Sequence, residues 1–270
     1  MSDERITSIV EALHDIVETS VIWSRGLVNQ GGPHRRIRGK ATPISIGEDE
    51  CQVFGKLIDA FQPQDCFIIG NGFGFSAAYI ALAMMANGGE SVVTLDAQTE
   101  GGEYCAEIAQ QLSDRLDLSI AKHKKGFSPQ DVPSAVESDA YELIFIDGRH
   151  SHPQVTHDFN GVLPYSDEKT IFVWHDFWIR GIPESVDVAR RAGLRCQWIP
   201  TSCEMVVGTK DDAVFEQIQE LFPSGDESRT GRSFARFLSI VAYELVFRFA
   251  GVWRDRLTGG KSRDEKGVQA

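Results

Sequence analysis

The sequence has few cysteines, an excess of acidic over basic residues, and no long apolar run free of charge. Its five cysteines are scattered and none forms a C-x-x-C pair, which argues against a disulfide framework and a zinc knuckle. Lys and Arg total 27 against 39 Asp and Glu, so the formal net charge is -12. That is the wrong sign for binding phosphates. We therefore expect a cytoplasmic protein without nucleic acid or membrane partners.

Neither end of the sequence carries a convincing membrane signal. The first twenty residues contain acids where a signal peptide needs a positive flank and an apolar block. The longest apolar segment, residues 233–253, includes Arg236, Glu244 and Arg248, each costly in hydrocarbon. Its apolar residues recur at helical spacing, which is typical of a helix with one buried face. We expect a packed or dimer-forming helix there.

From residue 48 onward, helical patterns alternate with short apolar runs. The runs CFII, LIFI and IFVW are apolar throughout, like strands of a parallel sheet covered on both faces. Two later runs, LRCQWIP and EMVVGTK, are joined by only three residues and must pair antiparallel. The expected helices cover residues 3–28, 48–61, 75–86, 101–113, 152–160 and 183–192. Besides the antiparallel pair, the expected strands cover residues 66–70, 91–95, 118–121, 142–146 and 170–174.

This alternation predicts an α/β fold. We expect a Rossmann-like, doubly wound, mostly parallel seven-stranded sheet with a C-terminal antiparallel strand pair and helical extensions at both ends. Residues 1–47 would form an N-terminal helix and a basic cap loop, residues 48–210 the Rossmann-like domain, and residues 211–270 a C-terminal helical extension with a mobile tail.

The stretch FIIGNGFGFS places Gly70, Gly72 and Gly74 between a buried strand and a helix. Glycines let the main chain turn sharply and approach a ligand at the carboxyl edge of the sheet. Asp96 ends the next strand, where a carboxylate can accept hydrogen bonds from a ribose diol. Gly72, Gly74 and Ala77 also satisfy the G-x-G-x-x-A dinucleotide fingerprint. A nicotinamide-dependent oxidoreductase is therefore an alternative.

Two later strands are each followed at once by acidic and imidazole side chains. Asp147 and His150 follow one strand, and His175 and Asp176 follow the next. Because the ends of parallel strands are neighbours, Asp147 and Asp176 can converge on one divalent cation, with His175 or water completing its shell. Such a cation lowers the pKa of a coordinated hydroxyl, and His150 can accept its proton. The pattern favours activation of an alcohol or phenol over hydride transfer.

The order of FIIGNGFGFS, VVTLDA, KKGFSPQDV, YELIFIDGRHSH and TIFVWHDFW resembles the class I S-adenosylmethionine-dependent methyltransferases. Within them it is most similar to the small-molecule O-methyltransferases of the catechol, caffeoyl-CoA and macrolide-sugar types. The resemblance covers about residues 45–210. It implies S-adenosylmethionine as cofactor and methyl transfer to a hydroxyl of a small molecule, with or without the help of Mg²⁺ or another divalent cation.

The resemblance also implies roles for individual residues. The three glycines would border the methionine part of the cofactor, Asp96 its ribose, and the segment from Gly126 to Ser128 its adenine, while His150 stands where relatives place a general base. The implied cofactor contacts are Gly70, Asn71, Gly72, Gly74, Asp96, Ala97, Gly126, Phe127, Ser128 and Asp147; the implied catalytic residues are Asp147 and His150; and the implied metal ligands are Asp147, His175 and Asp176.

Two positions depart from the family pattern. Ile68 stands where many relatives have an acidic residue, so the amino group of the cofactor must find a carbonyl or another side chain. His175 and Asp176 replace an Asp-Asn or Glu-Asp pair and are a softer pair for Mg²⁺. An NAD(P)-dependent oxidoreductase and a non-catalytic binding module are the alternatives. The sequence does not identify the methyl acceptor.

Overall fold

The computed structural model describes residues 4–16, 36–37, 40–41, 46–98, 103–151, 153–177 and 181–223. Three expectations fall outside these residues: the continuation of the first helix beyond residue 16, the basic cap loop as a whole, and the helix at 233–253 with its role in a dimer. None of the helices in the described ranges is both long and apolar enough to cross a membrane.

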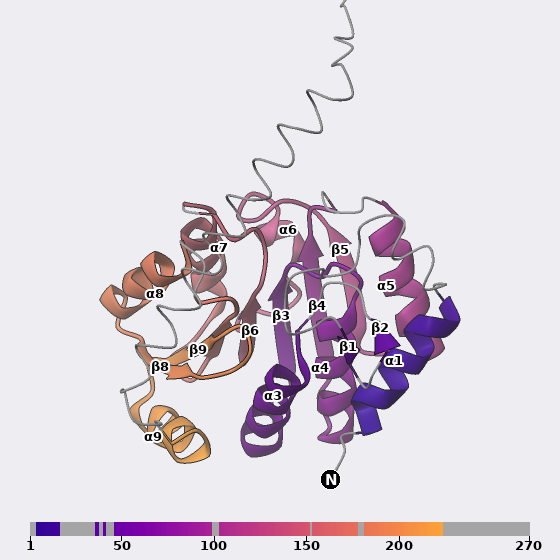
Figure 1. Cartoon of the computed structure of the whole chain (residues 1–270). Helices are drawn as coiled ribbons and strands as arrows, with labels where there is room; N and C mark the ends of the chain where they lie inside the picture. Colours follow the sequence, from indigo (N-terminus) through magenta and orange to yellow (C-terminus); the bar gives the residue numbers. More distant parts are fainter. Residues whose placement is uncertain are drawn as a thin grey trace, which may run out of the picture. The chain divides into compact units, whose positions relative to one another are not determined.

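A seven-stranded sheet forms the centre of the fold, with strand order β5-β4-β3-β6-β7-β9-β8 (Figure 1). The first five strands in this order pair in parallel, whereas β9 is antiparallel to both of its neighbours. The strands are β3 (Asp65–Ile69), β4 (Ser91–Asp96), β5 (Ala121–Lys125), β6 (Leu143–Ile146), β7 (Ile171–Trp174), β8 (Arg195–Ile199) and β9 (Met205–Thr209). A separate antiparallel pair joins β1 (Arg36–Ile37) and β2 (Lys40–Ala41). The predicted mostly parallel sheet with a C-terminal antiparallel pair is confirmed.

Helices cover both faces of this sheet, as the apolar strands require. Successive side chains of a strand point to opposite faces, so Cys66 and Ile68 of β3 enter one core cluster while Phe67 and Ile69 enter another. The first cluster includes residues of α1, α3, α4, α5 and α9, and the second includes residues of α6, α7 and α8. The helices are α1 (Glu4–Ile16), α3 (Glu48–Phe61), α4 (Phe75–Ala86), α5 (Glu103–Arg115), α6 (Val132–Ala135), α7 (Gln154–Val162) with the 3-10 turn η2 (Leu163–Tyr165), α8 (Ile182–Arg191) and α9 (Asp212–Leu221).

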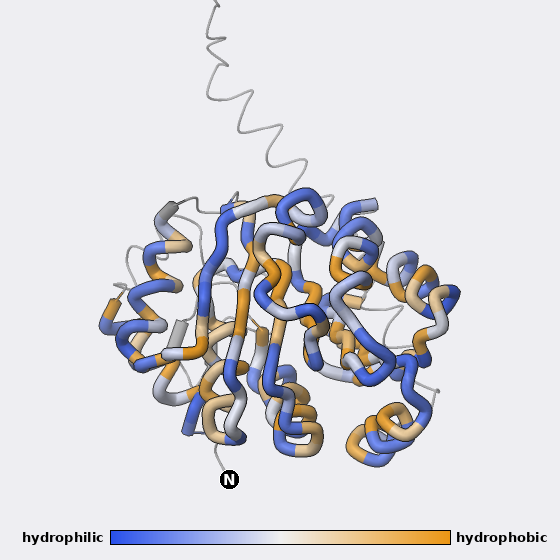
Figure 2. The backbone as a smooth tube through the Cα atoms, turned by 180° about the vertical axis from the view of Figure 1, so that it is seen from behind, coloured by the Kyte–Doolittle hydropathy of each residue, from blue (hydrophilic) through white to orange (hydrophobic). Residues whose placement is uncertain are grey.

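Helix α4 is apolar on nearly every side, and it packs between the sheet and the helices α1, α3 and α5. A helix with no polar face is stable only when it is buried on all sides. Figure 2 shows that the central strands are hydrophobic as well, and they form part of the same buried interior. The glycine bend is therefore followed directly by a helix that is packed against its neighbours along its length.

The helix predicted at 75–86 has those bounds, and most other predicted elements agree within two residues. The strand predicted at 118–121 is wrong in position, because β5 runs from Ala121 to Lys125 with the sequence AKHKK. This strand lies at the edge of the sheet and carries polar side chains, so it lacks the apolar run by which the inner strands are recognised. The expected division of the chain at residues 47 and 210 stays a prediction.

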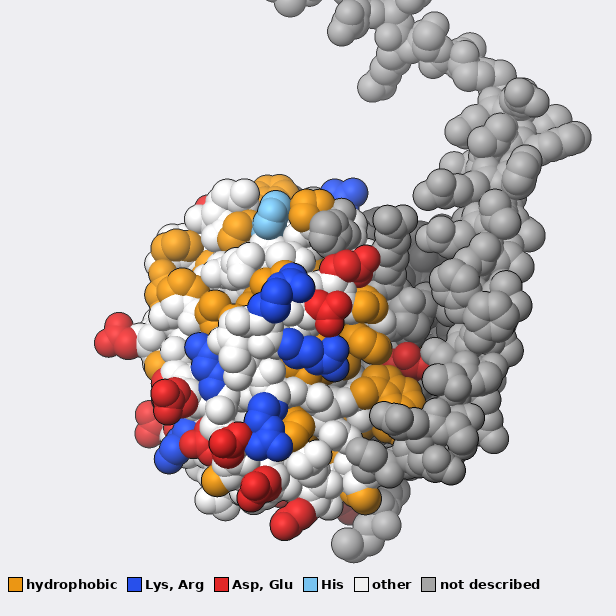
Figure 3. Space-filling view, turned by 90° about the vertical axis from the view of Figure 1, so that its left-hand side faces the viewer, with side chains coloured by type: hydrophobic (Ala, Val, Ile, Leu, Met, Phe, Trp, Pro, Cys, Tyr) orange, Lys and Arg blue, Asp and Glu red, His pale blue; other side chains and the backbone are white. Residues whose placement is uncertain are grey.

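The surface beside β8 mixes both signs of charge. Arg190 pairs with Asp187 on α8, and Arg195 of β8 pairs with Asp212 of α9; all four side chains are largely exposed. Figure 3, which views the molecule from this side, shows Lys and Arg interspersed with Asp and Glu. Exposed pairs of this kind contribute little to stability.

Candidate functional site

The ends of β3, β4, β6 and β7 lie along one edge of the sheet because these strands pair in parallel. The chain continues from β3 to β4 on one side, whereas β6 lies on the other side of β3. Open α/β sheets bind ligands at the crevice that such a change of direction creates. The loops at this edge comprise residues 70–74, 96–98, 147–151 and 175–177.

The glycine bend after β3 depends on two different properties of glycine. Gly70 has a φ of +88°, and a Cβ atom there would lie 2.1 Å from the carbonyl oxygen of Asp147. Gly72 has a φ of +48°, but a Cβ atom there would meet nothing within 4 Å. The first glycine thus permits close contact between the ends of β3 and β6, while the second borders open space.

Asp96 fastens the glycine bend to the end of β4. Its Oδ2 accepts hydrogen bonds from the backbone N–H groups of Asn71 (2.7 Å) and Gly72 (3.0 Å), and its Oδ1 accepts one from Gln98. A carboxylate has about four acceptor positions, so one is left for another donor. Ala97 follows directly and is half-buried.

The side chain of Asn71 is engaged within the fold by a polar network. Its Nδ2 lies 3.1 Å from Nδ1 of His123, which is also 3.1 Å from Oγ1 of Thr94, and Nε2 of His123 lies 2.8 Å from Oγ of Ser113. Burial lowers the pKa of His123. A neutral ring with its proton on Nε2 therefore accepts from Asn71 and Thr94 and donates to Ser113. Sequence reasoning missed this network, since no pattern marks His123 in the irregular text of β5.

The loop of Gly126, Phe127 and Ser128 lies beside the end of β4. The N–H of Gly126 donates to the carbonyl of Asp96 (3.0 Å), and the ring of Phe127 is 57% exposed. Gln154 of α7 donates from Nε2 to the carbonyl of Ser128 and to Oδ1 of Asp158, both at 2.7 Å. Helix α7 therefore holds the loop in place.

Asp158, which accepts the hydrogen bond from Gln154, is buried. Only 1% of its surface is exposed, and burial raises the pKa of its carboxyl to about 6. The hydrogen bonds that it accepts reduce this rise without cancelling it. The carboxyl thus changes its charge close to neutral pH.

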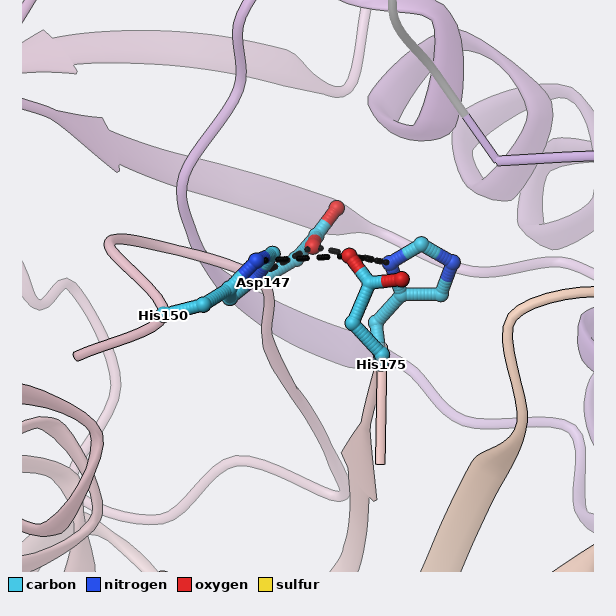
Figure 4. A group of neighbouring side chains, drawn as sticks. Asp147, His150 and His175 are labelled. Carbon is cyan, nitrogen blue, oxygen red and sulfur yellow. Dashed lines mark hydrogen bonds and ion pairs between the residues drawn. The ribbon is translucent and has the colours of Figure 1, made fainter. Parts of the chain in front are cut away.

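Asp147, His150, His175 and Asp176 gather at the ends of β6 and β7 (Figure 4). Oδ1 of Asp147 lies 3.2 Å from Nε2 of His150 and 3.1 Å from Nδ1 of His175. Oδ2 of Asp176 lies 3.3 Å from Nδ1 of each histidine. The two aspartates and two histidines therefore form a closed ring of contacts.

The backbone of Asp176 makes this gathering geometrically feasible. Consecutive side chains of a strand point to opposite faces, so His175 and Asp176 would normally diverge. Asp176 has a φ of +55°, a left-handed conformation that Asp tolerates better than most residues. The turn lets His175 contact Asp147 while Asp176 contacts both histidines, and such conformations concentrate at functional sites.

The electrostatics of the ring are set by burial and by opposite charges. Burial alone would raise the pKa of Asp147, but His175 and His150 hold it well below its usual range. Burial alone would lower the pKa of His150, but Asp147 and Asp176 raise it, and the same two aspartates with Glu50 raise the pKa of His175 well above its usual value. Imidazolium and carboxylate therefore stabilise each other in this ring.

Glu50, which sequence reasoning missed, is the fifth charged residue of the site. It lies in the first turn of α3, is fully buried, and places Oε2 3.1 Å from Nε2 of His175. Glu50 follows Gly47 by three residues, the spacing of a capping box, and accepts the N–H of Gly47. This spacing marks a helix start, but nothing in it indicates a contact with a strand end 125 residues further on.

The donor atoms of the ring also suit a metal ion. Asp147, His150, His175 and Asp176 each offer one donor atom, and these atoms lie within 4.8 Å of one another. Ligands held about 2.0–2.2 Å from a tetrahedral cation lie about 3.3–3.6 Å apart. The observed separations of 3.1–3.3 Å lie at or just below the lower limit of this range. A divalent cation would replace the imidazole protons that now face the carboxylates.

Comparison with known proteins finds a match over the same region of the chain. Residues 67–177, from β3 to the turn after β7, match the family described as a methyltransferase domain. No curated protein matches the sequence.

Solved structures resemble about three quarters of the chain. An O-methyltransferase from Bacillus cereus in complex with SAH is 15% identical, with a TM-score of 0.57, and the match covers 77% of this chain and 91% of that one. The O-methyltransferase TomG from Streptomyces achromogenes, in complex with SAM, is 14% identical, with a TM-score of 0.55 and coverage of 77% and 90%. A methyltransferase from Geobacter sulfurreducens is 15% identical, with a TM-score of 0.52 and coverage of 72% and 96%. At these identities the likeness establishes the fold.

Proposed function

We propose that this chain, which contains a methyltransferase domain and has the fold of the class I S-adenosylmethionine-dependent methyltransferases, transfers a methyl group from S-adenosylmethionine to a hydroxyl of a small molecule. One observation supports a hydroxyl as the methyl acceptor. The ring of Asp147, His150, His175 and Asp176 lies at the same sheet edge as the glycine bend, so groups that hold and deprotonate an oxygen stand beside the expected cofactor site.

The cofactor site is proposed from the loops at that edge. Gly72 borders open space, where main chain can meet the methionine part, and Asp96 keeps an acceptor position for a ribose hydroxyl. The exposed ring of Phe127, with Gly126 and Ser128, offers an apolar cover for adenine. The complexes of two structural neighbours with SAH and SAM support this assignment.

The remaining proposed cofactor contacts are Gly70, Asn71, Gly74, Ala97 and Asp147. Ile68, which replaces the acidic residue of many relatives, is fully buried in the core. The amino group of the cofactor must therefore bind to a main-chain carbonyl of the bend or to Asp147, whose N–H donates to the carbonyl of Ile69 (2.9 Å). Asp147 lies next to the bend, so a main-chain carbonyl of the bend and Asp147 itself are both within reach of the amino group.

In the proposed reaction His150 is the general base. The acceptor hydroxyl gives its proton to His150, its oxygen attacks the methyl carbon in line with the sulfur, and the carbon–sulfur bond breaks with its electron pair moving to sulfur. The products are S-adenosylhomocysteine, the methyl ether and protonated His150. Asp147 orients the imidazole and stabilises the charge that it gains, as a carboxylate beside a catalytic histidine does. Alignment of the reactants supplies much of the rate.

Asp147, His175 and Asp176 are the proposed ligands of a divalent cation. When bound, such a cation lowers the pKa of a coordinated hydroxyl and fixes its direction. The two aspartates also hold His150 from both sides, so the base and the proposed ligands form one unit. His150 is neutral, and thus able to accept a proton, only above its raised pKa.

Binding measurements separate this proposal from its main alternative. In isothermal titration calorimetry the protein should bind S-adenosylhomocysteine in about the micromolar range and should not bind NAD. The same titration with NADP tests whether the protein binds the other nicotinamide dinucleotide. Binding of a dinucleotide without binding of S-adenosylhomocysteine would favour the oxidoreductase, and binding of neither would favour a non-catalytic module.

We also propose a cytoplasmic location and a homodimer through residues 233–253. All five cysteines are free, which supports a reducing compartment, and the helical spacing of apolar residues in that segment supports a packed interface. Light scattering on the full chain gives the molar mass that tests the dimer.

A further inference from the structure

Glu50 connects three parts of the chain that are distant in sequence. Its Oε1 accepts hydrogen bonds from the N–H of Cys203 (2.9 Å) and from Oγ1 of Thr201 (3.2 Å), both between β8 and β9. Its Oε2 accepts the N–H of Gly47 (2.7 Å) and lies 3.1 Å from Nε2 of His175. A buried carboxylate is stable only when its oxygens are paired in this way. Glu50 is therefore fixed on both sides before it meets His175.

This fixed carboxylate determines how the ring of His175 is presented. Nε2 of His175 lies 3.1 Å from Oε2 of Glu50 in an ion-pair contact without hydrogen-bond geometry, and because a carboxylate can only accept, Nε2 carries the ring proton that faces it. The opposite nitrogen, Nδ1, then faces Oδ1 of Asp147 at 3.1 Å and Oδ2 of Asp176 at 3.3 Å. Histidines that bind metals show the same arrangement, with one nitrogen on the metal and the other N–H on a carboxylate.

We propose that Glu50 is a positioning residue that holds Nδ1 of His175 toward Asp147 and Asp176, and that the resulting donor set binds transition-metal ions such as Co²⁺ or Zn²⁺ more tightly than Mg²⁺. The inference rests on the proposed function, since it concerns the cation site of that reaction. Mg²⁺ prefers oxygen ligands and keeps much of its water, whereas imidazole nitrogen suits cobalt, nickel, copper and zinc. The imidazole of His175 among the three proposed ligands therefore favours the latter group.

The chain contains a matched control for Glu50 at the preceding residue. Asp49 accepts hydrogen bonds from the N–H and Oγ of Ser202, so it ties the same helix to the same loop. Within the described residues, the hydrogen bonds of Asp49 go to Glu50 and Ser202 and not to His175, whereas Oε2 of Glu50 lies 3.1 Å from Nε2 of His175. Glu50→Gln and Asp49→Asn each remove one negative charge at the start of α3, but only the first changes the partner of His175.

The experiment measures metal binding by the full-length protein after dialysis against a chelator. The wild type should bind Co²⁺ more tightly than Mg²⁺ in titration calorimetry, and the bound Co²⁺ should show visible absorption typical of mixed nitrogen and oxygen ligands. Glu50→Gln should weaken Co²⁺ binding by about 10- to 100-fold. Asp49→Asn should bind Co²⁺ like the wild type. Equal Co²⁺ affinity in all three proteins, or Mg²⁺ binding at least as tight as Co²⁺ binding in the wild type, would overturn the proposal.

A second measurement needs no variant. In the Zn²⁺-loaded wild type labelled with ¹⁵N in histidine, nuclear magnetic resonance should show the proton of His175 on Nε2 and the metal on Nδ1; the reverse assignment contradicts the proposal. Binding of S-adenosylhomocysteine, measured on the same samples, keeps the two hypotheses apart. Wild type that binds Co²⁺ as expected but not S-adenosylhomocysteine would refute the methyltransferase function and leave the role of Glu50 standing.

Discussion

The glycine bend allows a test in which two neighbouring substitutions should behave differently. Gly70→Ala introduces a Cβ atom 2.1 Å from the carbonyl oxygen and 2.7 Å from the carbonyl carbon of Asp147. Because both atoms belong to the main chain, no side chain can move aside, and the ends of β3 and β6 must separate. Gly72→Ala introduces the same methyl group into open space.

The magnitudes follow from these distances and from the φ angles. A left-handed conformation costs an alanine about 1–2 kcal/mol, which applies to both variants. Forcing the two strand ends apart adds about 1–3 kcal/mol for Gly70→Ala alone. We therefore expect Gly70→Ala to lower the free energy of unfolding by about 2–5 kcal/mol and Gly72→Ala by about 1–2 kcal/mol, out of a total of about 5–15 kcal/mol.

Urea unfolding followed by tryptophan fluorescence measures both losses, and titration with S-adenosylhomocysteine measures cofactor affinity. Gly72→Ala should lose cofactor affinity without a large loss of stability, since its methyl group enters the proposed cofactor space. Gly70→Ala should lose both. If Gly70→Ala proves as stable as Gly72→Ala, the close contact between Gly70 and Asp147 is not a feature of the folded protein.

Two other substitutions test the base and the buried acid. His150→Ala should lower turnover by about 10²- to 10⁴-fold without changing the affinity for S-adenosylhomocysteine. The control His157→Ala, at an exposed position on α7, should leave turnover unchanged. Equal turnover of the two variants would exclude His150 as the base. Asp158→Asn should stabilise the fold at pH 8 by about 2–3 kcal/mol and at pH 5 by about half as much. A carboxyl whose pKa is raised from 3.8 to about 6 stabilises the fold fully only below pH 3.8, and it loses this contribution as pH rises through 6. Urea unfolding at the two pH values measures the difference, and a gain that is the same at both would contradict the raised pKa.

The sequence predicts those parts of the molecule that follow from local pattern. Buried parallel strands are apolar throughout, so β3, β6 and β7 could be located within one residue. Parallel strands also end at a common edge, so topology brings Asp147, Asp176 and the two histidines to one place, while their convergence also needs the left-handed turn at Asp176. Local pattern and topology thus account for most of the fold and for the location of the candidate site.

The parts that could not be predicted depend on contacts between distant segments. Glu50 reads as an acidic residue at a helix start, and only the packed fold brings it to His175. His123 lies in an edge strand without an apolar pattern, and its partners Asn71 and Ser113 come from two other elements. Hydrophobic periodicity shows which face of an element is buried, but not which polar group it meets there.

Asp147 belongs to both halves of the site. Its main chain touches the glycine bend, while its carboxylate contacts both histidines. A ligand that moves the bend therefore also shifts the ring of acids and imidazoles. Because coupling between two binding equilibria is reciprocal, the factor by which the proposed cofactor changes the affinity for the proposed cation must equal the factor by which that cation changes the affinity for the cofactor. Cooperativity between the two ligands would thus originate in a single residue.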